Sequence, residues 1–104
     1  MLRKFMIERN VPGIGSKTAS EMGEAAKTSN GALAQLEGIQ WQHSYVTADK
    51  TFCVYLAESE ALIREHARLS GFPANTITEV IEVIDPSTER QCALTRRLRV
   101  AADM

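Results

Sequence analysis

The sequence predicts an α+β domain of the ferredoxin-like, split-βαβ type, with a four-stranded antiparallel sheet. Two observations lead to this fold class. Segments with strand and helix periodicity follow one another in the order β-α-β-β-α-β, and a short turn joins the two central strands as a hairpin. Apolar residues also occupy both alternating sides of the strands, so the sheet face without helices needs a cover. A second copy of the chain would supply it, in an assembly of the dimeric α/β-barrel type.

The first predicted strand covers residues 3–9, where the apolar run Phe5-Met-Ile lies between charged residues. Residues 11–15 then interrupt regular structure, because the proline fixes φ and the two glycines favour turn conformations. These glycines do not match a phosphate-binding loop, since a third glycine and a lysine at the required spacing are missing.

The first predicted helix begins near Ser16 or Thr18 and extends to Leu36. Glu21 lies three residues after Thr18, which is the spacing of a capping box. The Ser29-Asn-Gly stretch weakens the helical pattern and predicts a kink.

The second predicted helix covers residues 59–70, with Ser59 as its N-cap and Gly71 as its C-terminal stop. The remaining strands alternate or are rich in β-branched residues, and they are predicted at residues 39–47, 51–57 and 76–84. One domain therefore spans residues 1–104, with a core at about 3–86 and a C-terminal extension at 87–104.

The turn at residues 48–50 leaves the hairpin register open. A three-residue turn would pair Tyr45 with Cys53 and His43 with Tyr55. A two- or four-residue turn would break this pairing.

Five segments together are similar to a family of small bacterial proteins of largely unassigned role. They are Ile7-Glu-Arg-Asn-Val-Pro-Gly, Ser44-Tyr-Val-Thr-Ala-Asp-Lys-Thr-Phe-Cys-Val-Tyr, Ile63-Arg-Glu-His-Ala, Gly71-Phe-Pro-Ala and Val83-Ile-Asp-Pro-Ser-Thr. One branch of this family is described as nickel-binding, with a dimeric ferredoxin-like fold. The resemblance therefore implies the fold, a homodimer and nickel as the candidate metal.

His66 is the main candidate site residue, because helical spacing places it with Leu62 and Leu69 on the apolar side of the second helix. One interpretation is a core histidine whose ring nitrogen has a hydrogen-bond partner. The other is a metal ligand, or an acid/base beside a pocket between helix and sheet.

Further candidates lie on the predicted strands. His43 and Glu8 are candidate metal ligands, with a surface histidine and a salt-bridged carboxylate as the alternative interpretations. Candidate pocket residues, which can equally be sheet packing residues, are Tyr45, Cys53 and Tyr55.

Two functions of different class follow. The first is a dimeric metal-binding or metal-handling protein, with divalent nickel as the candidate that the resemblance implies; imidazole suits nickel, copper and zinc, and oxygen ligands could complete an octahedron. The second is a cofactor-free enzyme of the monooxygenase or isomerase type, with His66 as acid/base in a small-molecule pocket. No set of catalytic residues can be assigned from the sequence.

The net charge of −1 argues against a nucleic-acid partner, although Arg96, Arg97 and Arg99 form a basic tail. No apolar run approaches the roughly 20 residues of a membrane span, and no segment resembles a signal peptide. The expected location is the cytoplasm, with Cys53 and Cys92 reduced.

Overall fold

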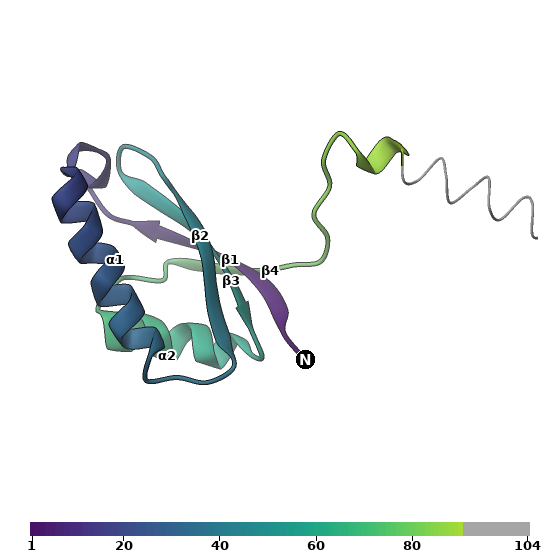
Figure 1. Ribbon diagram of the computed structural model, residues 1–104, viewed down its shortest axis with the longest axis horizontal. Coiled ribbons are helices and arrows are strands. Elements are labelled where there is room, and N and C mark those ends of the chain that lie inside the picture. Colours follow the sequence, from purple (N-terminus) through teal and green to yellow (C-terminus); the bar gives the residue numbers. More distant parts are fainter. Residues whose placement is uncertain (91–104) are drawn as a thin grey trace, which may run out of the picture.

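The computed structural model describes residues 1–90. Its elements in chain order are β1 (Arg3–Asn10), the 3₁₀ helix η1 (Ile14–Ser16), α1 (Ala19–Leu33), β2 (Ile39–Val46), β3 (Lys50–Ala57), α2 (Glu60–Ser70) and β4 (Thr76–Val80) (Figure 1). The four strands form one antiparallel sheet in the order β2-β3-β1-β4. This arrangement confirms the predicted ferredoxin-like α+β fold. The predictions for Cys92 and for the arginines of the tail lie outside the described residues.

Both helices begin as the sequence predicts. The Thr18 hydroxyl accepts from the Glu21 N–H over 3.2 Å, and the Glu21 carboxylate accepts from the Thr18 N–H over 3.0 Å, which completes the capping box. In α2, the Ser59 hydroxyl accepts from the Leu62 N–H over 3.3 Å. Gly71 closes α2 in the left-handed conformation, with φ of 80°. These contacts satisfy backbone groups that a helix end leaves without partners.

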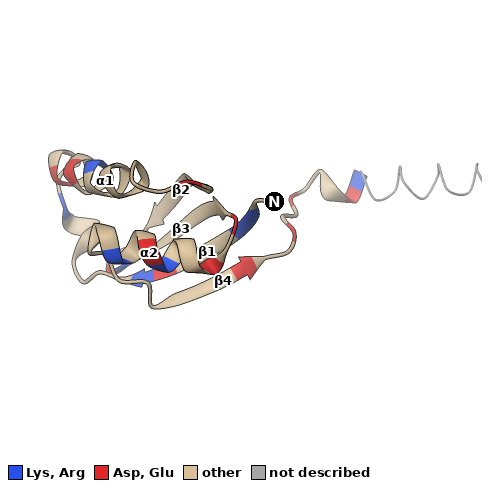
Figure 2. Cartoon of the chain, turned by 90° about the horizontal axis from the view of Figure 1, so that it is seen from below, with Lys and Arg blue, Asp and Glu red and all other residues tan. Residues whose placement is uncertain are grey.

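Helix α1 continues through Ser29-Asn-Gly without interruption and ends at Leu33, three residues earlier than predicted. The Leu36 N–H bonds to the Leu33 carbonyl, so the chain tightens into a turn after the helix. Acidic and basic residues both occur along α2 (Figure 2). Arg64 forms an ion pair with Glu60 over 3.2 Å.

The β2–β3 hairpin turns at Ala48 and Asp49, where the Thr47 N–H donates to the Lys50 carbonyl over 2.8 Å. A bulge also interrupts the pairing between Trp41 and His43. The two-residue turn places His43 opposite Val54, Ser44 opposite Cys53 and Tyr45 opposite Phe52, and the bulge changes only the pairing beyond His43. The pairing expected from a three-residue turn is therefore not formed.

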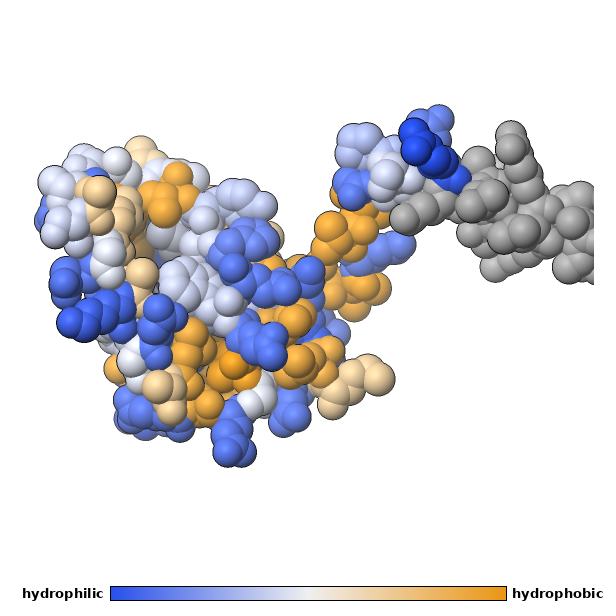
Figure 3. Space-filling model, viewed as in Figure 1, coloured by the Kyte–Doolittle hydropathy of each residue, from blue (hydrophilic) through white to orange (hydrophobic). Residues whose placement is uncertain are grey.

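Strand β4 ends at Val80, whereas the sequence pattern predicts a strand as far as residue 84. The neighbouring strand β1 sets this end. Val80 pairs with Lys4, and β1 begins at Arg3, so β1 offers almost no further residues for pairing beyond Val80. Residues 81–84, here called the apolar arm, lead away from the body of the molecule (Figures 1 and 3). Exposure is 88% for Ile81, 65% for Val83 and 72% for Ile84.

The sheet has two distinct faces. The helix face carries the core, which α1 and α2 cover, and its main members are Phe5, Ile7, Cys53, Tyr55, Ala57 and Ile63. The opposite face, here called the open face, faces away from the two helices. It presents Met6, Glu8, His43, Tyr45, Phe52, Val54 and Leu56. Among residues 1–90, no helix is long and apolar enough to cross a membrane.

Candidate functional site

The sheet divides the predicted site residues into two groups. Alternation along the strands places Cys53 and Tyr55 on the helix face, where His66 of α2 joins them. The same alternation places Glu8, His43 and Tyr45 on the open face. The two histidines therefore lie on opposite sides of the sheet and do not meet within one chain.

His66 is completely buried, with 0% exposure. Its Nε2 lies 3.3 Å from the carbonyl oxygen and 3.2 Å from the hydroxyl oxygen of Ser29 on α1. With the proton on Nε2 the ring donates to the carbonyl oxygen, which can only accept; with the proton on Nδ1 it accepts from the hydroxyl instead. In both tautomers Nδ1 bonds to no group of residues 1–90. The ring also packs against Tyr55, with 5.3 Å between the ring centroids.

The environment of His66 favours the neutral ring. Burial lowers the pKa of His66 most, the nearby Arg9 cation lowers it further, and the contact with Ser29 raises it. Burial likewise raises the pKa of Tyr55, which keeps its hydroxyl protonated at neutral pH. The interior of the helix face is thus uncharged apart from Arg9.

A pocket of about 250 Å³ lies between α1 and the helix face of the sheet. Most of its wall is apolar, and polar side chains lie on the sheet floor beside Cys53 and Tyr55. His66 does not line this pocket, although its partners Ser29 and Tyr55 do. Cys53 is 6% exposed and its thiol lies 3.6 Å from the Thr51 hydroxyl.

Two residues of this region, Arg9 and Ser29, were not predicted from the sequence. Arg9 could have been found, because it follows Phe5 and Ile7 on the same alternating side of β1 and therefore points inward. Ser29 offered no comparable signal, since its partner His66 lies 37 residues away along the chain.

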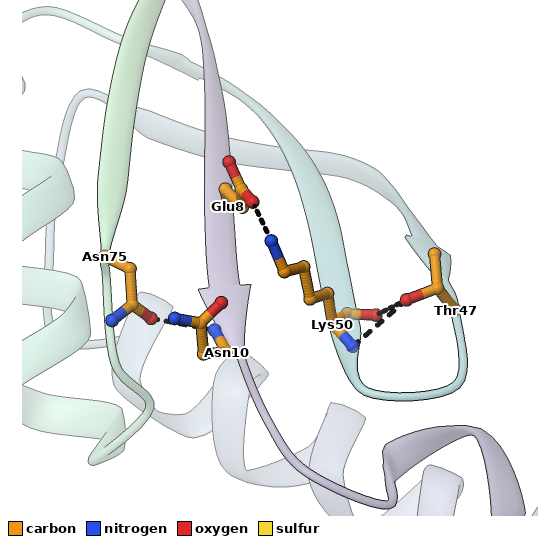
Figure 4. Close-up of polar contacts among 5 residues, drawn as sticks. All are labelled: Glu8, Asn10, Thr47, Lys50 and Asn75. Atoms are coloured by element: carbon orange, nitrogen blue, oxygen red, sulfur yellow. Dashed lines mark hydrogen bonds and ion pairs between the residues drawn. The ribbon is translucent and has the colours of Figure 1, made fainter.

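The open face presents its polar groups among apolar ones. His43 is exposed, and its ring meets the ring of Tyr45 edge to face at 5.1 Å. Glu8 forms an ion pair with Lys50 over 2.7 Å (Figure 4). Phe52 of β3 lies between Glu8 and Tyr45 in the same row across the sheet. His43 and Glu8 thus share a face but are separated by strand β3.

The described part of one chain does not bring enough ligands together for a metal ion. Within residues 1–90 there is no group of three or more histidine, cysteine, aspartate or glutamate side chains that could hold one. The buried ring of His66 offers a single lone pair, and the open face offers His43 and the paired carboxylate of Glu8. A metal site of higher coordination would require ligands from outside residues 1–90, such as another chain or water.

Comparison with known proteins relates the chain to one family. Residues 5–80 match the family model described as "Nickel responsive protein SCO4226-like". The chain is also similar in structure to SCO4226 from Streptomyces coelicolor A3(2), with a TM-score of 0.64 and 21% sequence identity. That likeness covers 78% of this chain and 99% of the other, and at this identity it establishes the fold. No curated protein sequence matches the chain.

Proposed function

Because the chain belongs to the SCO4226-like family of nickel-responsive proteins, we propose that it binds Ni²⁺ as a homodimer whose ligands lie on the open face. The observation that carries this proposal is the exposed imidazole of His43 on that face. An accessible ring nitrogen suits Ni²⁺, and a carboxylate such as Glu8 is a compatible second ligand. His66, in contrast, is enclosed, and its Nε2 contacts Ser29.

The homodimer is proposed because apolar surface remains uncovered within residues 1–90 of the single chain. Phe52 and Leu56 lie half-buried on the open face beside Met6. The apolar arm at residues 81–84 presents three large aliphatic side chains to solvent. A second copy related by a two-fold axis would cover both regions at once, since each copy contributes the same face and the same arm.

Face-to-face packing would also supply the missing ligands. Two packed sheets lie about 10 Å apart, so their side chains share one layer. In that layer the dimer would hold two copies of His43 and two of Glu8, where one chain holds one of each. Two imidazoles and two carboxylates form a mixed nitrogen and oxygen ligand set, which water molecules can complete to six.

Lys50 competes with the metal for Glu8. Its ammonium group lies 2.7 Å from the carboxylate oxygen, and both side chains are partly exposed (Figure 4). An exposed ion pair of this kind contributes only about 0–1 kcal/mol, so a divalent cation can displace the lysine.

The alternative function, a cofactor-free enzyme, would use the pocket under α1. The pocket exists, but His66 lies behind its wall and does not line it. The enzyme hypothesis therefore lacks the histidine that it assigned as acid/base, and nickel binding is the function that we propose.

The experiment that tests the proposal is elemental analysis of protein purified without a histidine tag. After growth in nickel-containing medium, we expect nickel to co-purify with the dimer. The measured nickel should correspond to a fixed number of ions per dimer. Protein that remains free of nickel after incubation with NiCl₂ and gel filtration would contradict the proposal.

A further inference from the structure

Arg9 is a buried cation on the helix face, with 3% exposure. Its Nη1 donates to the carbonyl oxygen of Pro73 over 2.7 Å and to that of Phe72 over 3.4 Å. Its Nη2 is buried and bonds to no group within residues 1–90. None of the ion pairs formed by the described residues involves Arg9. A guanidinium ion buried without a carboxylate is unusual, because removing a charge from water is unfavourable unless a counter-charge compensates it.

This cation forms part of the wall of the pocket under α1. Arg9 lies opposite Thr51 in the sheet, and the neighbouring pair Ser44 and Cys53 continues the polar floor. The remaining wall is mainly apolar, from Val11, Ile14, Met22, Ala25, Ala26, Trp41, Val46 and Phe72. The pocket lining contains no aspartate or glutamate, so its formal charge is the single positive charge of Arg9.

We infer that this pocket binds a small monocarboxylate with an aliphatic or aromatic body, its carboxylate directed toward Arg9. A carboxylate supplies the missing counter-charge and can accept from a guanidinium N–H. The apolar wall under α1 matches the body of such a molecule. A doubly charged phosphate fits less well, because one guanidinium would leave a net negative charge among apolar side chains.

The inference is independent of nickel binding. The pocket lies on the helix face, whereas the proposed metal ligands lie on the open face. Either function can fail without affecting the other.

Trp41 provides the measurement, because it is the only tryptophan of the chain and it lines the pocket. We would titrate the protein with octanoate and, separately, with octan-1-ol, and follow the fluorescence of Trp41. The two molecules share an aliphatic body and differ in charge. We expect saturable binding of octanoate that is about tenfold tighter than that of the alcohol, as one charge-assisted hydrogen bond predicts.

Three variants locate the effect. Arg9→Met should remove the preference for octanoate over the alcohol. Ala26→Leu should weaken both ligands because the larger side chain fills the pocket, whereas Ala19→Leu, on α1 but outside the pocket lining, should bind as the wild type does.

Equal affinity of the wild type for acid and alcohol would overturn the inference. So would the absence of saturable octanoate binding, or unchanged binding in Ala26→Leu. The first two of these outcomes need no variant, so the test stands even where Arg9→Met does not fold.

Discussion

The imidazole Nε2 of His66 on α2 lies 3.3 Å from the carbonyl oxygen of Ser29 on α1. A serine within a helix and a histidine on an apolar helix side are each unusual in isolation. Here Ser29 and His66 are hydrogen-bond partners, and this buried contact joins α1 and α2. The interpretation of His66 as a core histidine with a ring-nitrogen partner therefore has direct geometric support.

Burial of His66 predicts a pH-dependent stability. Burial holds the pKa of His66 below its ordinary value of 6.5, so the unfolded chain binds the proton more readily than the folded chain. The stabilising effect is complete above this ordinary value and is lost as the pH falls through the lower folded-state pKa. Urea denaturation between about pH 7 and pH 5 should show a falling free energy of unfolding.

The matched comparison is His66→Gln, which keeps a side-chain hydrogen-bond donor and does not titrate. Its free energy of unfolding should fall less over the same pH range. If the pH dependence is the same in both proteins, His66 does not cause it.

Gly71 predicts a backbone effect. Its φ of 80° is a conformation that residues with a Cβ rarely adopt, and an added Cβ would meet no atom within 4 Å. Gly71→Val should therefore lower the free energy of unfolding by about 1 kcal/mol or more, through backbone strain alone.

Gly31→Ala in α1 is the control for this experiment. A Cβ added at Gly31 also meets no atom within 4 Å, but Gly31 lies inside a helix. It should raise the free energy of unfolding by about 0.5–1 kcal/mol. An unchanged melting curve for Gly71→Val would show that α2 ends without need of a left-handed residue.

The proposed homodimer predicts that a charge on the open face disrupts association. Phe52→Lys should give a folded monomer at micromolar concentration, because it places two like charges in the packed layer. Ala61→Lys, on the exposed side of α2, should remain dimeric. Sedimentation velocity measures both, and a monomeric wild type would contradict the dimer.

Lys50 predicts a gain in metal binding. Lys50→Met releases the carboxylate of Glu8 from its ion pair and should increase the affinity for Ni²⁺ several-fold. Lys17→Met removes the same charge beside Glu21 on α1 and should leave the affinity unchanged. Calorimetric titration with NiCl₂ compares the two variants. A lower affinity of Lys50→Met for Ni²⁺ than of the wild type would argue against Glu8 as a ligand.

The order of the elements and both helix caps could be predicted, because these depend on local periodicity and on residues three positions apart. The end of β4 could not, since it is set by where the neighbouring strand β1 begins. The bulge between Trp41 and His43 also depends on the partner strand. The faces of His43 and Tyr45 are set by the two-residue turn, whose length the sequence pattern left open.

Nickel binding by the open face is tested most directly by calorimetric titration of NiCl₂ into untagged wild type, His43→Gln and His66→Gln. The substitution at His43 removes the proposed imidazole ligand and should lower the affinity about tenfold or more. The substitution at His66 changes the core below α1 and α2 and should leave the affinity as in the wild type. Unchanged affinity in His43→Gln, together with a loss in His66→Gln, would place the metal on the helix face and contradict the proposed site.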